Sequence, residues 1–128
     1  MKDFIYAVET HKTVADAVSA IEDEAVKNGF KILHIHNFDD ILASKGFKME
    51  AYKSVEICNA KAAYGILTEN ADIGLLLPCK INVYIRDGKT YIAGLRPTII
   101  GQFVDSAEVN RIADEVEKAI INIIDSAR

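Results

Sequence analysis

The sequence predicts an α+β domain in which helices cover one face of a mainly antiparallel sheet. Strand-like and helix-like segments follow one another in the order β-α-β-(short α)-β-α-β-β-α. Asp87-Gly88 is a strong hairpin signal between the last two strands, and it breaks the strict alternation of a doubly wound parallel sheet. With 128 residues, 50% of them hydrophobic, the chain suits a single domain over residues 1–128.

The first part of the chain reads as two strands separated by a helix. Apolar side chains alternate between two faces over residues 4–8, as in a strand. A capping-box-like sequence then begins at Thr13, and apolar residues recur at helical spacing until Gly29, which suits the left-handed position after a helix. Residues 30–38 predict a second strand, and a short helix follows it.

The second part of the chain supplies the rest of the sheet and two further helices. Residues 52–58 predict a third strand, and Asn59 is a favourable N-cap for the helix that follows. A long strand over residues 73–85 pairs through the hairpin with a strand over residues 89–95. A helix with one broad apolar stripe begins at residues 105–106 and completes the fold.

The composition bounds the partners and the compartment. The formal net charge is -4 and the sequence pI is about 5.3. The 15 basic residues are scattered among 19 acidic ones, so we expect no nucleic-acid partner and no membrane partner. The N-terminus lacks the apolar segment of a signal peptide, and two cysteines are too few for a secreted disulfide scaffold. We therefore expect a cytoplasmic protein.

Strand parity predicts which side chains lie on the face without helices. Residues 55 and 57 of one strand and residues 81, 83 and 85 of another are apolar and should face the helices. The opposite face would carry these polar side chains: Ser54, Glu56, Cys58, Lys80, Asn82, Tyr84, His34 and His36. Such a face is solvated, buried against a second copy in a homodimer, or a site for a small-molecule ligand.

Recognised catalytic and metal motifs give little support to an enzyme. The sequence lacks the dinucleotide, P-loop, zincin, nucleophile-elbow and Cys-x-x-Cys patterns, so we expect no cofactor and no catalytic activity. His34 and His36 share one strand face, and neutral imidazoles suit zinc or copper if Glu56 or Cys58 supplies a third ligand. Two ordinary exposed histidines are the favoured interpretation of this pair.

Cys58 and Cys79 admit three interpretations. Both can be small buried hydrophobes. Cys58 can be a reactive thiol, because it precedes a helix N-terminus and Asn59 can donate a hydrogen bond nearby. The two can also form a disulfide or share a metal. Parity directs Cys79 toward the helices and Cys58 toward the open side, so a pairing requires a bulge at Pro78.

The remaining candidate groups are a carboxyl group and a guanidinium group. Glu56 is the best acid candidate, because a partly covered sheet face raises the pKa of a carboxyl group. Arg96 could bind an anion, although a surface arginine is the simpler interpretation. The predicted ligand or thiol site consists of Glu56, Cys58, Asn59, Pro78, Cys79, Lys80 and Tyr84.

Two segments of the chain carry a family resemblance. Glu56-Ile57-Cys58-Asn59, then Ala63, then Ile73-Gly74-Leu75-Leu76-Leu77-Pro78-Cys79 resemble the domain-of-unknown-function 302 family, and the resemblance extends over nearly the whole chain. It implies a curved antiparallel sheet backed by helices, similar to the TATA-binding-protein half-repeat, and a homodimer without an established activity. The family usually has proline where this chain has Ala60, which relaxes the entry into the helix.

Three functional hypotheses follow from these patterns. The favoured one is a non-enzymatic, homodimeric cytosolic domain that binds a small ligand or a partner protein. The first alternative is a thiol-dependent redox enzyme or sensor that uses Cys58, with Cys79 as the resolving thiol. The second alternative is a metal-binding protein that uses His34, His36 and one of the cysteines.

Overall fold

Five strands form one antiparallel sheet in the computed structural model, which describes residues 4–128. The strand order is β1-β5-β4-β3-β2, and all four neighbouring pairs are antiparallel. In chain order the elements are β1 Ile5–Thr10, α1 Val14–Lys27, β2 Lys31–Asn37, α2 Phe38–Ala43, β3 Tyr52–Cys58, α3 Ala60–Glu69, η2 Ala71–Leu76, β4 Cys79–Arg86, β5 Lys89–Leu95, η3 Pro97–Gln102 and α4 Ala107–Ala127. The predicted α+β class and the predicted order of strands and helices are confirmed.

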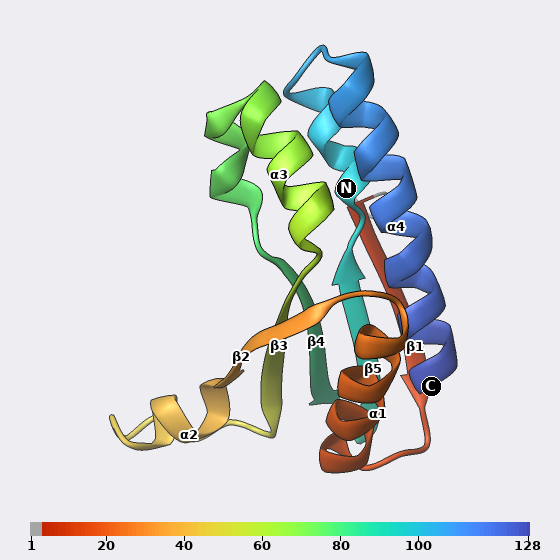
Figure 1. Ribbon diagram of the computed structural model, residues 1–128. Helices are drawn as coiled ribbons and strands as arrows, with labels where there is room; N and C mark the ends of the chain where they lie inside the picture. Colours follow the sequence, from red (N-terminus) through yellow and green to blue (C-terminus); the bar gives the residue numbers. More distant parts are fainter. Residues whose placement is uncertain (1–3) are drawn as a thin grey trace.

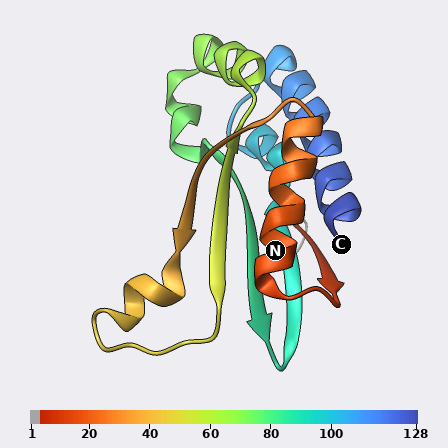
Figure 2. The same ribbon diagram turned by 60° about the horizontal axis from the view of Figure 1, so that its bottom comes forward.

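Helices α1 and α4 pack side by side on one face of the sheet, and α3 lies beside α4 beyond the sheet end (Figure 1). No helix within residues 4–128 covers the opposite face, which we call the open face (Figure 1; Figure 2). Within the same residues, no helix is both long enough and apolar enough to cross a bilayer. The two layers leave one face of the sheet for contacts outside the chain.

The core fills the space between the sheet and the helices α1 and α4. Its fully buried large side chains are Ile21, Val55, Ile57, Ile81, Val83, Ile92, Val109, Ile120, Ile123 and Ile124. The parity predicted for β3 and β4 therefore holds. Side chains of α4 lie close to the sheet at Gly94, where an added Cβ would lie 3.0 Å from Ile124 and 3.2 Å from Ile120. A side chain at this position would push α4 away from the sheet.

Local capping explains why the long helices begin and end where they do. The Thr13 side chain accepts a hydrogen bond from the backbone of Asp16, and Ser106 accepts one from Val109. Gly29 has a φ of +82°, and the hydrogen bonds that follow α1 form a Schellman motif around it. These three termini agree with the sequence prediction.

The predicted strand over residues 73–85 is wrong in its first part. Residues 71–76 form the 3₁₀ helix η2, because the Asn70 side chain accepts a hydrogen bond from Asp72 and starts a helical turn. The strand β4 begins only at Cys79. Pro78 lies before the strand, next to a cis peptide bond, and is not a bulge within it.

A bulge does occur in β2, where the pairing register with β3 shifts between Ile32 and His34. Leu33 is the extra residue and is 47% exposed, whereas Ile32 packs against the core opposite Ile57. Simple alternation, which places His34 and His36 on the open face, would direct Leu33 with Ile35 toward the helices, and the bulge leaves Leu33 exposed instead. The extra residue shifts the alternation by one position after Ile32. As a result, His34 and His36 lie on the open face as predicted.

Candidate functional site

The predicted site residues are divided between two places. Five of them line one pocket at the end of the sheet: Cys58, Asn59, Pro78, Cys79 and Lys80. Glu56 and Tyr84 lie outside the pocket on the open face, because they alternate with buried neighbours that face the helices. The residues expected to form one site therefore belong to two places, the pocket and a separate polar surface on the open face.

The pocket has a volume of about 240 Å³ and lies beneath α3, between η2, η3 and the ends of β3, β4 and β5. Most of its wall is aliphatic or aromatic: Phe30, Ile57, Ala62, Ala63, Ile66, Leu75, Leu76, Leu77, Leu95, Pro97, Ile100 and Val116. The Leu75 side chain on η2 is 91% exposed, so one edge of the pocket is an uncovered apolar surface. Few polar side chains interrupt this wall, as is usual for a small-molecule site.

Asn59 fixes the start of α3 above the pocket. Its Oδ1 accepts a hydrogen bond of 2.9 Å from the backbone of Ala62, as its predicted N-cap role requires. Its Nδ2 donates to the carbonyl oxygen of Gly29 at 3.1 Å. The amide therefore joins the end of α1 to the start of α3, and it donates its hydrogen bond to a carbonyl oxygen and not to the Cys58 thiol.

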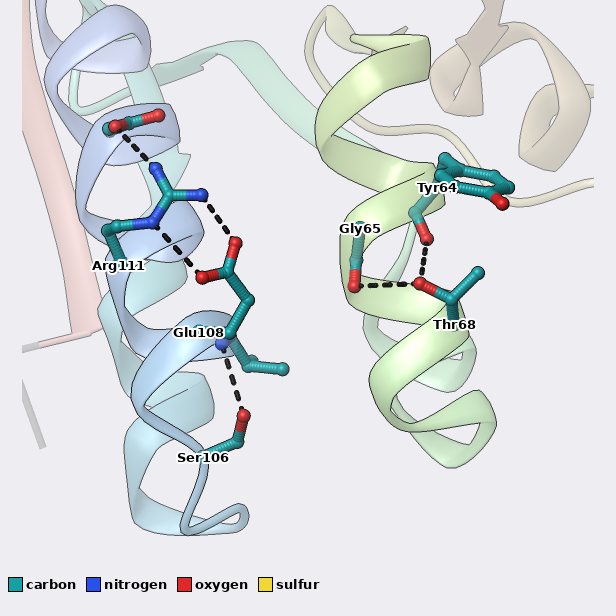
Figure 3. Close-up of polar contacts among 8 residues, drawn as sticks. Tyr64, Gly65, Thr68, Ser106, Glu108 and Arg111 are labelled. Atoms are coloured by element: carbon teal, nitrogen blue, oxygen red, sulfur yellow. Dashed lines mark hydrogen bonds and ion pairs between the residues drawn. The ribbon is translucent and has the colours of Figure 1, made fainter.

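Apolar packing holds the other side of α3 against α4. An added Cβ at Gly65 would lie 2.6 Å from the Cδ1 atom of Ile112, so the glycine allows the two helices to approach closely. The polar contacts of this region stay within each helix (Figure 3): Thr68 donates to the carbonyl oxygen of Tyr64 on α3, and Arg111 pairs with Glu108 on α4. The roof of the pocket is therefore positioned by shape and by the Asn59 cap.

The two cysteines lie at the same pocket from neighbouring strands. Both are free thiols and partly buried, and Cys79 pairs in register with Ile57, the residue before Cys58. Burial raises the pKa of the Cys79 thiol to about 11, with a smaller contribution from Cys58. Although parity separates the two residues onto opposite faces of the sheet, both line the pocket at the sheet end. No bulge at Pro78 is involved.

Lys80 places a positive charge at the edge of the pocket. Its side chain is exposed, and its register partner on β3 is Glu56. A hydrogen bond from His36 is the main reason that the pKa of Glu56 is lowered, and the charge of Lys80 contributes to the same shift. The prediction of a raised pKa for Glu56 is therefore wrong, because the hydrogen bond from His36, together with the charge of Lys80, outweighs desolvation.

The open face carries a hydrogen-bonded row and an aromatic row. The Ser54 hydroxyl donates to Asn82 at 2.6 Å, and Asn82 donates to the Tyr52 hydroxyl at 3.0 Å. Ring centroids between 4.5 and 5.8 Å apart connect His34, His36, Phe38, Tyr52, Tyr84 and Tyr91. The aromatic row is not among the features predicted from the sequence, although the even spacing of Tyr52 with Ser54 on one strand indicates a shared face.

The histidine pair does not extend to a metal cluster among residues 4–128. No group of three or more His, Cys, Asp or Glu side chains there is placed to hold a metal ion. The Nε2 atom of His36 points at the Glu56 carboxylate. The His34 ring packs edge-on against the His36 ring, with their centroids 4.5 Å apart. The contacts of the two rings are thus with each other and with the open face.

Comparisons with known proteins place this fold in a family. The chain is similar to the crystal structure of the uncharacterized conserved protein DUF302 from Bacillus stearothermophilus, with 28% identity and a TM-score of 0.92. That similarity covers 98% of this chain and 99% of the other. No curated protein matches the sequence. The model of the family "Domain of unknown function DUF302" matches residues 6–127, and the chain therefore belongs to this family.

Proposed function

We propose that this chain is a cytosolic binding module for a small, mainly apolar molecule with one anionic group. The observation that carries the proposal is the pocket of about 240 Å³, whose aliphatic wall has the cation Lys80 at its edge. Apolar surface supplies the binding free energy, and one charge at the rim orients the ligand. The exposed Leu75 at the rim favours a ligand whose apolar part extends to the pocket mouth.

Binding without chemistry agrees with the protonation of Cys79, one of the two thiols at the pocket. Apart from Lys80, the side chains at the pocket with reactive atoms are Cys58 and Cys79. A thiol with a pKa of about 11 is almost entirely protonated at neutral pH, which leaves Cys79 a poor nucleophile. The two free thiols also agree with a reducing compartment.

Octanoate is a suitable probe, because it combines an aliphatic chain with a carboxylate. Ala63→Phe should weaken octanoate binding at least about tenfold, because the new ring occupies pocket space. Ala60→Phe is the matched control, since Ala60 is exposed on the same helix and does not line the pocket. Isothermal titration calorimetry measures both affinities, and the melting temperature checks that each variant is folded.

The charge at the rim is tested with the same probe. Lys80→Gln should weaken octanoate binding about fivefold and leave octanol binding unchanged, because one partly screened charge contributes about 1 kcal/mol. Lys61→Gln removes an exposed charge from α3 that does not line the pocket. The proposal fails if wild-type protein does not bind octanoate, or if the Ala63 and Ala60 variants bind it equally well.

The shared position of Cys58 and Cys79 favours a second candidate, a thiol sensor. At pH 7, N-ethylmaleimide is expected to modify Cys58 before Cys79. Burial holds the Cys79 pKa at about 11, so roughly one molecule in ten thousand carries its thiolate. Peptide mass spectrometry over time gives the order, and both thiols should react at similar rates in denaturant. If Cys79 reacts first, or neither reacts before unfolding, the sensor is excluded.

A further inference from the structure

Residues 38–51, which we call the arm, project away from the sheet between β2 and β3 (Figure 1; Figure 2). The arm contains α2, which has no buried residue, and every residue from 40 to 50 is exposed. Its large apolar side chains and their exposed fractions are Phe38 39%, Ile41 50%, Leu42 38%, Phe47 67% and Met49 45%. An isolated short helix gains no stability from packing, so this segment needs another source of order.

Local hydrogen bonds supply that order. The amide of Gly46 donates to Ala43 at 3.0 Å and the amide of Phe47 donates to Leu42 at 2.9 Å, which together form a Schellman motif. Gly46 has a φ of +89°, as this motif requires. At the base of the arm, Lys53 pairs with Asp39 at 2.9 Å. The arm therefore has a defined shape, although its apolar side chains stay between 38% and 67% exposed.

The arm is continuous with the aromatic row of the open face. The Phe38 ring stacks on His36 with centroids 5.7 Å apart and meets Tyr52 edge-on at 5.8 Å. At typical side-chain areas, the exposed fractions leave roughly 500 Å² of apolar surface on the arm. Two arms that covered each other completely would bury roughly 1,000 Å², the area at which a specific interface becomes plausible.

We propose that the arm docks on a second copy of this chain around a twofold axis, so that each arm covers the other. Twofold contact requires a self-complementary surface, and the charges of the arm meet this requirement. Exposed Asp40 and Glu50 carry negative charge, whereas exposed Lys45 and Lys48 carry positive charge. An antiparallel arrangement can bring unlike charges together around the apolar centre. The arm shares no residue with the pocket, so this inference is independent of ligand binding.

The experiment compares two phenylalanines of equal exposure. Phe47→Glu places a charge at the centre of the arm, whereas Phe103→Glu changes a 68% exposed phenylalanine between η3 and α4. Sedimentation velocity from about 1 to 100 μM should show a dimer for wild type and for Phe103→Glu. The Phe47 variant should be a monomer, because the substitution should weaken dimerisation at least about 100-fold.

The outcomes separate the arm from other surfaces. A wild-type protein that remains monomeric over this range overturns the proposal, as does a Phe47 variant that dimerises like wild type. Equal dissociation of both variants also overturns it, because the effect would then be non-specific. If the Phe47 variant does not fold, Ile41→Lys provides the same test at a 50% exposed arm position. Octanoate affinity should be the same for wild type and for the folded arm variant.

Discussion

Replacement of Ile57 with alanine is expected to lower the free energy of unfolding by about 2–5 kcal/mol. Ile57 is fully buried on the helix side of β3, between its register partners Ile32 on β2 and Cys79 on β4. Truncation removes apolar contacts in the core and leaves a cavity that the neighbouring strands cannot fill. Urea unfolding followed by circular dichroism measures the loss, and a change below about 1 kcal/mol would contradict the described packing.

The same substitution also changes the pocket, because Ile57 is both a core residue and part of the pocket wall. The enlarged pocket should improve the affinity for decanoate relative to octanoate. Val55→Ala is the matched control: Val55 is fully buried on the same face of the same strand but does not line the pocket. This control should lose stability without a change in ligand preference. If both variants show the same preference between decanoate and octanoate, Ile57 does not contact the ligand.

Elements whose signals are local could be predicted from the sequence. The caps at Thr13 and Asn59, the left-handed glycine after α1 and the hairpin at Asp87-Gly88 each involve residues within a few positions of one another. Apolar and polar residues alternate over residues 54–57 of β3 and 80–86 of β4, because helices bury one face of each strand. In these places, propensity and tertiary packing favour the same structure.

The predictions from the sequence fail where a run of apolar residues is compatible with two different local structures. Residues 73–77 have strand-like composition, but the Asn70 side chain starts η2 immediately before them. Ile32 and Leu33 are both suitable for either face, and only pairing with β3 reveals the bulge that exposes Leu33. Both outcomes depend on contacts between segments, which hydrophobic periodicity does not encode.

The candidate site shows the same division. Parity gives the side of a strand on which a residue lies, but the pocket is formed where strands end and side chains from both sides border one space. Cys58 and Cys79 consequently reach one pocket from positions that parity separates. The pKa of Glu56 depends on His36, whose position opposite Ser54 follows from the β2 register after the bulge. Sequence patterns identify the candidate site residues, but the pairing of the strands determines which other side chains each of them contacts.

Asn59→Ala is expected to lower the free energy of unfolding by about 2 kcal/mol and to weaken octanoate binding. The substitution removes the N-cap of α3 and the hydrogen bond to the carbonyl oxygen of Gly29. Loss of a cap costs about 1 kcal/mol, and loss of a further hydrogen bond costs a similar amount. Since these two bonds position α3 above the pocket, affinity should fall even though no aliphatic wall residue changes. Urea unfolding and calorimetry measure the two effects.

Asn59→Asp separates the two roles of this side chain. A carboxylate still accepts the hydrogen bond from Ala62 and interacts favourably with the helix dipole, but it cannot donate to Gly29. If the cap alone positions α3, the aspartate variant should bind octanoate like wild type. If the connection to α1 is required, it should bind as weakly as the alanine variant while retaining more stability. We expect the second result, because of the two Asn59 hydrogen bonds only the one to Gly29 joins α3 to a different element and so helps to fix its distance from the sheet.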